Sequence, residues 1–350
     1  MKGSHLYCLL FTILGVVQYG VVASGSKSSV EDQQDVLCPV PEDIFPCVCG
    51  VNDNNTLDID CSKVVYEDEL ANVFRSYFPN PNFRRFTIKF NYYLQTLRDG
   101  ALGNTTYTEF FFTESVLEVV EKNALSGSFH TATYLNFYST KLQSFPFDDI
   151  SSFTKLVTLD LRFTYFHEFP NISSVTLKTL ALGGNPFDHL PTEAFVNTPS
   201  VSSINVYLGK LWNISSGTFS GLPYLESVDL SFNFLKHIPE AAVEVTSTTP
   251  TYINLNYNMI SSVEVDAFLG VTGGSIDLHS NQLKEIQEAV WRPLLQYKVQ
   301  LDLSKNPLEC GCELAWLVLN DTFLHQVNEN TTCADGRLVV DLDPADYEPC

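Results

Sequence analysis

Cysteine is absent from most of this chain: none occurs between Cys61 and Cys310, although the sequence contains nine. Basic residues are scarce, since 20 Lys and Arg stand against 41 Asp and Glu, for a formal net charge of −21. This shortage argues against nucleic acid or an anionic membrane as a partner, because both need a positive face. The excess acid is typical of a well-solvated protein, and a basic partner or bound divalent cations are the alternative.

A long apolar run is also missing beyond the first residues. The run at 6–17 is shorter than the ~20 residues that a membrane helix needs. It follows Lys2 and precedes small residues, with Val21 and Ala23 placed as a cleavage site expects, so residues 1–23 are predicted to be a signal peptide. We therefore expect a secreted, extracellular protein, with no membrane insertion, whose residues 24–37 form a flexible acidic segment.

The cysteines that remain form two groups of four, one at each end of the chain. An even number of cysteines in an exported protein favours disulfides. We favour pairing first to third and second to fourth within each group, although spacing alone does not exclude the two other pairings. The predicted bridges are Cys38–Cys49, Cys47–Cys61, Cys310–Cys333 and Cys312–Cys350.

Six Asn-x-Ser/Thr sequons agree with export, and they predict a glycoprotein. The acceptors are Asn54, Asn104, Asn171, Asn213, Asn320 and Asn330.

Ten segments between the two cysteine groups share one apolar pattern. Apolar residues recur at relative positions one, four, six, eleven and fourteen, position nine is usually small and polar, and the segments begin 21 to 25 residues apart. This is the period of leucine-rich repeats. Repeats 1 to 10 begin at Phe83, Tyr107, Ala132, Leu156, Leu177, Val201, Leu225, Pro250, Gly273 and Lys298.

Positions four and six alternate with polar neighbours, so each repeat predicts a short strand with one buried face. An Asn at position nine can satisfy the backbone of adjacent repeats where the chain turns inward. Gly209 occupies this position in repeat 6, where we expect the ladder to be irregular.

These features predict an α/β solenoid, a leucine-rich-repeat horseshoe with a parallel concave sheet. The open ends of a solenoid need caps, and the cysteine groups lie where caps must be. We expect an N-terminal cap over 38–82, repeats over 83–308 and a C-terminal cap over 309–350.

The concave face is the predicted ligand-binding surface, because its strands present a rigid, regularly spaced array of side chains. Exposed aromatic side chains cluster on it, and tyrosine offers contact area with a polar tip, which suits a protein or sugar ligand. The alternative is that some only pack against each other across strands. The candidates are Phe111, Tyr134, Tyr138, Phe163, Tyr207, Phe232, Tyr252 and Tyr257.

Position five carries a column of acidic and amide side chains that includes Asp229, Asp277 and Asp302. Neighbouring carboxylates can attract a cation, so these three are weak candidates for a calcium site. Asp is nevertheless common at this position of ordinary repeats, and we expect no bound cofactor.

The sequence gives no support for catalysis. It has no glycine-rich phosphate loop and no metalloprotease motif. A Ser231–His279–Asp302 triad fails because Ser231 and His279 lie two strands apart, about 10 Å. The basic residues near the amino end predict a solvated face that balances the acidic cap, or a contact for an anion or acidic glycan. They are Arg75, Arg84, Arg85, Lys89 and Arg98.

The cap motifs carry a closer resemblance. The segments 38–49, 289–293 and 333–344 resemble a crustacean family of secreted leucine-rich-repeat proteins named after the non-catalytic subunit of Oplophorus luciferin 2-monooxygenase. The resemblance covers essentially the whole chain after the leader. It implies a non-catalytic partner that associates with another secreted protein, such as a small catalytic subunit.

Three functions are therefore weighed. The first is a secreted, non-catalytic protein-binding scaffold or partner subunit. The second is an extracellular pattern-recognition or matrix protein that binds glycan or mineral surfaces. The third, an enzyme, is the least supported.

Overall fold

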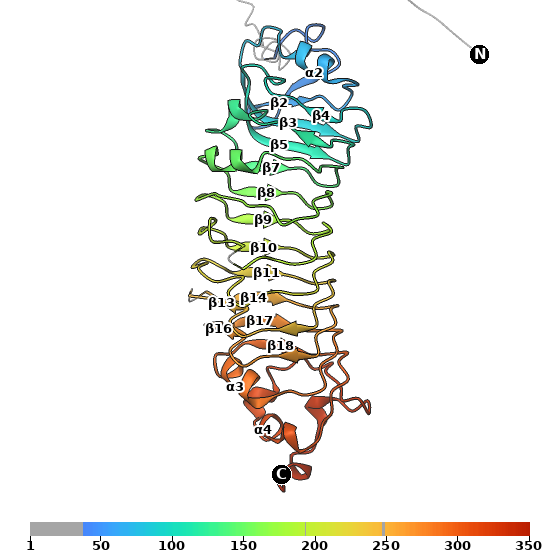
Figure 1. Cartoon of the computed structure of the whole chain (residues 1–350), viewed down its shortest axis with the longest axis vertical. Coiled ribbons are helices and arrows are strands. Elements are labelled where there is room, and N and C mark those ends of the chain that lie inside the picture. The colour runs from blue at the N-terminus through green and yellow to red at the C-terminus, as the bar shows by residue number, and fades with distance from the viewer. Residues whose placement is uncertain (1–37, 193, 247–248) are drawn as a thin grey trace, which may run out of the picture.

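A computed structural model describes residues 38–192, 194–246 and 249–350. The predicted signal peptide 1–23 and the acidic segment 24–37 lie outside the described residues. The described chain forms an elongated solenoid whose repeats stack from the amino to the carboxyl end (Figure 1). Within it, no helix is long and apolar enough to cross a membrane.

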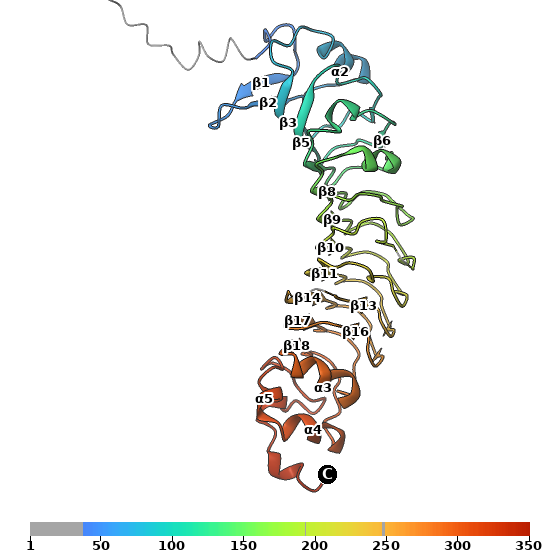
Figure 2. The same cartoon turned by 90° about the vertical axis from the view of Figure 1, so that its left-hand side faces the viewer.

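A 12-stranded sheet runs the length of the solenoid and lines its hollow side (Figure 2). Its first two strands form an antiparallel hairpin, and every later pairing is parallel. In spatial order the strands are β1 (Val48–Val51), β2 (Leu57–Asp60), β3 (Asn82–Lys89), β5 (Thr106–Thr113), β7 (Tyr134–Asn136), β8 (Thr158–Asp160), β9 (Thr179–Ala181), β10 (Ser203–Asn205), β11 (Ser227–Asp229), β14 (Thr251–Asn254), β17 (Gly274–Asp277) and β18 (Gln300–Asp302).

Ten of these strands, β3 to β18, are the strands that the ten repeats predict. Position four points inward in every one: Leu180, Ile204 and Val228, for example, are at most 1% exposed. The predicted leucine-rich-repeat fold with a parallel concave sheet is confirmed.

The outer side of the solenoid consists of turns, short strands and short helices. Buried side chains anchor these arcs, among them Phe195, Phe219 and Trp291. The outer strands pair in parallel as β4 (Thr96–Leu97) with β6 (Val119–Val120), β12 (His237–Ile238) with β15 (Ser262–Val263), and β13 (Val243–Glu244) with β16 (Phe268–Leu269). The helical segments are α2 (Glu67–Val73), η1 (Ser126–Ser128), η2 (Phe147–Ser152), α3 (Glu288–Gln296), η3 (Cys312–Leu314), α4 (Ala315–Val318), α5 (Asp321–Leu324), η4 (Val339–Asp341) and η5 (Pro344–Asp346).

Buried asparagines connect the repeats as predicted. Asn258 Nδ2 donates to the carbonyls of Leu230 and Leu255, and its Oδ1 accepts from the amide of Leu235. These bonds satisfy backbone groups that the inward turn would otherwise leave unpaired. In repeat 6, Gly209 has no side chain to make these bonds. The neighbouring Asn233 of repeat 7 supplies them in part, since its Oδ1 accepts from the amides of Gly209 and Leu211.

Position eight has a regularity that the apolar pattern does not reveal. Its backbone is left-handed in all ten repeats, with φ between 50° and 73°. The turn directs the position-eight amide to the position-seven carbonyl of the next repeat, as from Phe232 to Asn256. The chain therefore leaves the sheet in the same way ten times. The position-eight residues are Phe90, Glu114, Ser139, Phe163, Gly184, Leu208, Phe232, Tyr257, Ser280 and Lys305.

All four predicted disulfides are present, two at each end of the solenoid. At the carboxyl end, the cap also extends the sheet: Val327 forms a parallel bridge to Leu301 in β18. Leu314 and Leu317 close the core beneath it, whereas Leu319 is half exposed.

Candidate ligand-binding face

The strands are aligned so that like positions of successive repeats lie side by side on the hollow face. Position three of each repeat pairs with position three of the next, from Arg85 beside Glu109 to Ser275 beside Gln300. This alignment turns ten separated sequence positions into continuous rows of side chains.

Aromatic rings and guanidinium groups contact each other at the amino end of this face. The Arg85 guanidinium lies 4.2 Å from the centre of the Phe111 ring, and Phe111 stacks on Tyr134 at 5.2 Å. Partial burial, reinforced by the Asp160 carboxylate, raises the pKa of the Tyr134 hydroxyl. Tyr134 therefore stays a neutral hydrogen-bonding group at physiological pH.

A second group spans repeats 3 to 6. Arg162 is held by Asp160 and lies 5.3 Å from the centre of the Tyr138 ring, while Phe163 contacts both Tyr138 (5.5 Å) and Tyr207 (6.0 Å). The Asp160 carboxylate raises the pKa of Arg162 further, so its charge is fixed.

The contact between Phe163 and Tyr207 crosses repeat 5, and two glycines make room for it. A Cβ on Gly183 would lie 2.6 Å from the Tyr207 ring, and one on Gly184 would lie 2.4 Å from the Phe163 ring. These glycines let two aromatic side chains from non-adjacent repeats meet over the strand between them.

The third group lies toward the carboxyl end. Phe232 stacks on Tyr257 with 4.4 Å between ring centres, and Tyr257 meets the His279 ring at 5.3 Å. Tyr252 is 56% exposed on β14. Of the eight predicted aromatics, seven thus pack against other rings and Tyr252 alone extends freely from the described face.

Three predicted aromatics lie at the margin of the face, in the turn that follows each strand. Phe163, Phe232 and Tyr257 occupy the left-handed turn at position eight. The alternation of positions four and six could not reveal this, because the turn begins where the strand periodicity ends.

The column of acidic side chains has a structural role in the turn. Oδ1 of Asp229, Asp277 and Asp302 accepts the backbone amide of the position-seven residue in the same repeat. Asp277 and Asp302 also accept from Asn256 and Asn328. Among the described residues, no three His, Cys, Asp or Glu side chains gather as a metal site would require.

His279 forms a hydrogen-bonded chain, but with a different serine from the one weighed in the sequence. Ser304 Oγ donates to Asp302, and His279 Nδ1 lies 2.7 Å from the same hydroxyl. Ser231 instead donates to Asp229. The Ser304 proton is directed at a carboxylate and not at the imidazole, so the order differs from that of a nucleophilic triad.

The basic spot near the amino end is largely neutralised by carboxylates. Arg84 pairs with Asp58 and Glu109, Arg85 pairs with Glu109 at 2.8 Å, and Arg98 pairs with Asp68 at 2.8 Å. Arg75 donates to Asn72, and Lys89 makes no ion pair among the described residues. The pairing favours a charge-balanced surface over an anion site.

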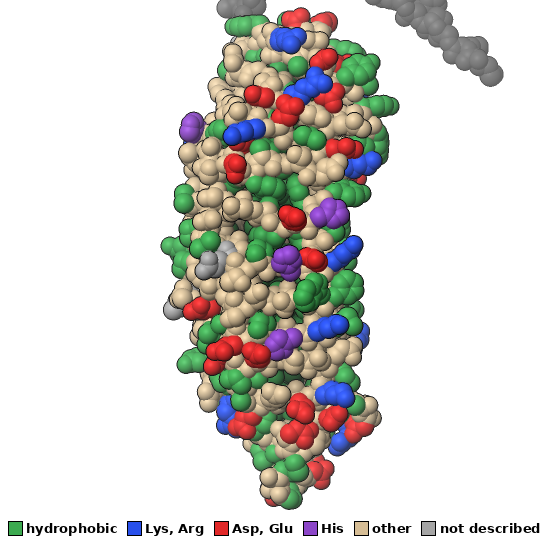
Figure 3. Space-filling model, in the orientation of Figure 1, with side chains coloured by type: hydrophobic (Ala, Val, Ile, Leu, Met, Phe, Trp, Pro, Cys, Tyr) green, Lys and Arg blue, Asp and Glu red, His purple; other side chains and the backbone are tan. Residues whose placement is uncertain are grey.

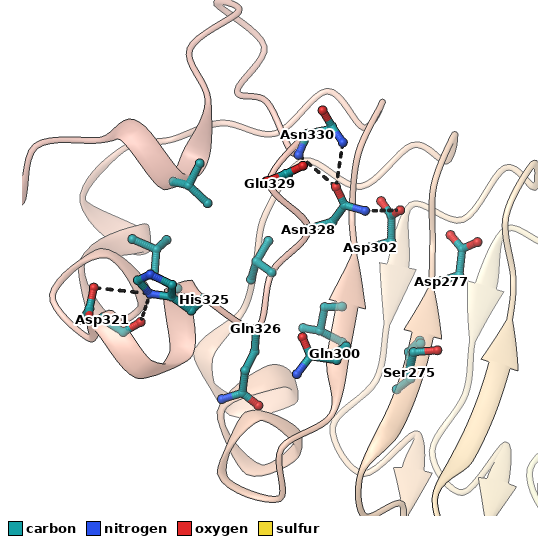
Figure 4. A pocket seen from close by; sticks show the side chains of 15 residues that line it. Ser275, Asp277, Gln300, Asp302, Asp321, His325, Gln326, Asn328, Glu329 and Asn330 are labelled. Carbon is teal, nitrogen blue, oxygen red and sulfur yellow. Dashed lines mark hydrogen bonds and ion pairs between the residues drawn. The ribbon is translucent and has the colours of Figure 1, made fainter.

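A cavity of about 800 Å³ lies where the last strands meet the C-terminal cap (Figure 4). Asp302 and Asn328 point toward one another at its edge, and Gln300 and Gln326 line it from β18 and from the cap segment beside it. Sequence reasoning missed this cavity because it did not recognise that 326–328 lie alongside β18, where Val327 forms a bridge to Leu301. The apolar pair Leu324 and Val327, three residues apart, was the available signal.

The predicted glycosylation acceptors lie off the strands. Asn54, Asn104, Asn171 and Asn330 are exposed, while Asn213 and Asn320 are half-buried. None belongs to the ten repeat strands, and Asn330 lines the C-terminal cavity.

Comparisons with known proteins agree with this architecture. A family model described as leucine rich repeat matches residues 175–235. A solved structure of a complex of Latrophilin 3, Unc5D and FLRT2 (LRR) includes a chain that superposes on this one with a TM-score of 0.65 at 19% sequence identity. The superposition covers 85% of this chain and 92% of that one. This likeness shows the fold alone. Tsukushi-A of Xenopus laevis is 33% identical over 27% of each protein.

A more extensive similarity exists to the Oplophorus-luciferin 2-monooxygenase non-catalytic subunit of Oplophorus gracilirostris. The identity is 36% over 313 residues, which cover 89% of this chain and 87% of that protein. The chain belongs to the leucine-rich-repeat family that includes this non-catalytic subunit.

Proposed function

We propose that this protein is a secreted, non-catalytic scaffold that binds another extracellular protein on the concave face of its sheet. In this proposal residues 1–23 are removed as a signal peptide, and residues 24–37 form a flexible acidic segment. The N-terminal cap spans 38–82, the repeats span 83–308 and the C-terminal cap spans 309–350. The six sequons carry glycans. The row of aromatic and guanidinium groups on the aligned strands is the observation that carries it.

The side-chain packing on this face supports a role in binding. Arg85 on Phe111 and Arg162 on Tyr138 hold long side chains in fixed positions before any ligand arrives. Fixed aromatic and arginine side chains lose little conformational entropy on binding, and such residues dominate protein interfaces. The lack of sequons on the strands leaves the aromatic part of the face clear of glycan, and Asn330 borders only its carboxyl end.

The family relationship supports the same class of function. The related protein is named as a non-catalytic subunit, which describes a protein that acts together with another. By analogy, the partner of this chain is a secreted protein that performs the chemistry itself.

A capture experiment with paired variants tests the proposal. The full secreted chain is immobilised and exposed to extracellular fluid from the source animal, in parallel with a triple variant Tyr134→Ala, Tyr207→Ala and Tyr252→Ala. A control, Tyr224→Ala with Tyr297→Ala, removes two tyrosines that are each 61% exposed off the concave face. We expect one protein in stoichiometric amount on the unmodified chain and the control, and at least a tenfold loss on the triple variant.

Two outcomes would contradict the proposal. If the triple variant retains the partner as the control does, the ligand does not use this face. If the chain retains only chitin, peptidoglycan or mineral, and Phe111→Ala with Tyr134→Ala abolishes that retention, the glycan-binding alternative replaces it. The stacked pair Phe111 and Tyr134 is the feature that favours this alternative, because sugar rings stack on such platforms.

A further inference from the structure

The cavity between the last strands and the C-terminal cap is built from three neighbouring segments. β17 and β18 pair in parallel, and the bridge between Leu301 and Val327 places the cap segment 326–328 beside β18 in the same register. Side chains at equivalent positions therefore lie side by side around one space of about 800 Å³ (Figure 4). This volume lies in the range of ligand pockets.

The charged groups of this cavity are almost all acidic. Asp277, Asp302, Asp321 and Glu329 line it, and no lysine or arginine is among its described lining residues. The one imidazole, His325, is directed at Asp321, whose carbonyl oxygen lies 2.7 Å from Nδ1. Asp277, Asp302 and Glu329 form no ion pair in the described part of the chain. Three carboxylates are therefore left without a countercharge.

Most amide donors of the cavity wall are already engaged. Asn328 Nδ2 donates to Asp302, and Asn328 Oδ1 accepts from Asn330 Nδ2. Gln326 Nε2 donates to the Thr322 carbonyl. Donors that are satisfied within the wall do not serve a ligand, so the cavity is suited to a group that donates hydrogen bonds.

The amide oxygen of Gln326 is an acceptor without a partner. The residue is only 8% exposed, and its Oε1 has no hydrogen bond within the described chain. Because Thr322 holds Nε2, the oxygen is turned to the side of Gln300 (Figure 4). Gln300 is exposed and can move aside for a ligand. A buried polar atom without a partner is unfavourable, and a donor from a ligand would satisfy it.

We propose that this cavity binds an arginine side chain of a partner protein. The source of the arginine rests on the proposed function, whereas the chemistry of the site rests on the cavity alone. A guanidinium group has a fixed positive charge and five N–H donors in one plane. Asp302 and Gln326 lie one segment and two positions apart, about 8 Å between their Cα atoms from the strand spacing and rise. One guanidinium can donate to both side chains, while its aliphatic stem covers Leu324 and Val340 in the cavity wall.

Other ligands fit these groups less well. A lysine donates from a single nitrogen, so it does not bridge Asp302 and Gln326. A calcium ion needs about six to eight oxygen ligands close together, and no three acidic or histidine side chains gather in that way among the described residues. A neutral sugar would leave the carboxylates without a countercharge.

The charge of the surrounding cap favours the same ligand. Residues 309–350 contain nine Asp and Glu and one basic residue, Arg337. Figure 3 shows acidic side chains gathered at this end of the molecule. An acidic surface attracts a basic group of a partner and speeds its approach.

Titration with N-acetyl-arginine amide, followed by nuclear magnetic resonance, tests the cavity without the partner. The guanidinium is the only charge of this probe, and N-acetyl-citrulline amide is its neutral isostere. We expect the full secreted chain to bind the arginine probe with a Kd of about 1 mM and the citrulline probe at least tenfold more weakly. The titration is repeated with Thr332→Ala, which removes the sequon of Asn330 at the cavity.

Two variants with matched controls locate the binding. Gln300→Arg places a guanidinium of the chain itself in the cavity, and Gln296→Arg makes the same change on α3, outside it. Asp302→Asn removes one carboxylate, and Asp229→Asn alters a carboxylate that makes the same two hydrogen bonds to its serine. We expect Gln300→Arg and Asp302→Asn to weaken the probe at least tenfold, with an unchanged circular dichroism spectrum, and the controls to bind normally.

Equal affinity for the arginine and citrulline probes overturns the cationic site, and so does the absence of binding at about 20 mM in both sequon backgrounds. Normal probe binding by a folded Gln300→Arg chain overturns its location in this cavity.

Capture of the partner then tests the source of the arginine. Loss of the partner from Gln300→Arg, but not from Gln296→Arg, supports an arginine of the partner. A partner that Gln300→Arg retains, although the probe no longer binds, overturns this source and leaves a small guanidinium compound as the ligand. If the unmodified chain captures no partner while the probe binds, the proposed function fails and the partner's arginine with it, whereas the cationic cavity stands.

Discussion

A single buried amide at position nine holds together backbone groups of two repeats. Asn258 makes four such bonds, three donated by Nδ2 and one accepted by Oδ1, and it is only 7% exposed. Water cannot replace these bonds without entering the core. The side chain therefore contributes more to the stability of the fold than its small size implies.

Replacement of this amide should destabilise the protein measurably. We expect Asn258→Ala to lower the free energy of unfolding by about 3 kcal/mol, because the Leu235 amide loses its partner and the Leu230 and Leu255 carbonyls each lose one of their two asparagine donors. Chemical denaturation followed by circular dichroism measures the change, with the exposed Asn197→Ala as control. Equal denaturation midpoints for the two variants would show that the hydrogen bonds of Asn258 do not contribute measurably to the stability of the protein.

Each repeat as an element is defined by its turns as much as by its strand. The left-handed residue at position eight is glycine in only one repeat, and elsewhere Phe, Tyr, Leu, Ser, Glu or Lys accepts that conformation. The inter-repeat hydrogen bond and the side-chain contacts offset the local backbone cost of this conformation, which is of order 1–3 kcal/mol. The exposed aromatic residues at this position are therefore fixed in direction.

Glycines outside position eight allow the cost of backbone strain to be separated from the cost of steric overlap. Gly274 has φ +72°, and a Cβ there would lie 2.1 Å from the Thr251 carbonyl oxygen; Gly221 also has φ +72° but open space; Gly50 has neither constraint. We expect alanine to cost little at Gly50, about 1–2 kcal/mol at Gly221, and more at Gly274, where β17 must also shift.

Melting temperatures of the three variants measure this order. The comparison is matched, since each substitution adds one methyl group. If Gly274→Ala and Gly221→Ala have the same melting temperature, β17 can move away from the Thr251 carbonyl without loss of stability.

The whole molecule carries a net charge of −21, and its described ion pairs lie mainly at the amino end and on the surface. Self-repulsion of like charges opposes the compact state and is screened by salt. The carboxylates of the position-five column accept hydrogen bonds from backbone amides and leave no clustered metal site among the described residues.

Added salt should therefore raise the melting temperature, and calcium should have no extra effect. We expect the same rise with CaCl2 as with NaCl of equal ionic strength, measured by scanning calorimetry. A larger rise with calcium that disappears in Asp302→Asn would restore the cation site to this column.

Periodicity by itself determined the architecture of this protein. Apolar residues every 21 to 25 positions can be buried together only if the segments stack, so the sequence predicted ten strands, their register and the capped ends. The disulfide pairing agreed with the structure, although spacing left two alternatives in each cap. The rows of the concave face followed from the same count of positions.

Tertiary structure alone decided what those rows do. Whether Asp302 faces a cation or an amide depends on Asn328, a residue of the cap that no repeat count placed beside it. The contact of Phe163 with Tyr207 depends on two glycines in the repeat between them, and the direction of the aromatic side chains at position eight depends on the left-handed turn there. A period fixes which residues share a face, whereas the contacts between side chains depend on neighbours that are distant in the sequence.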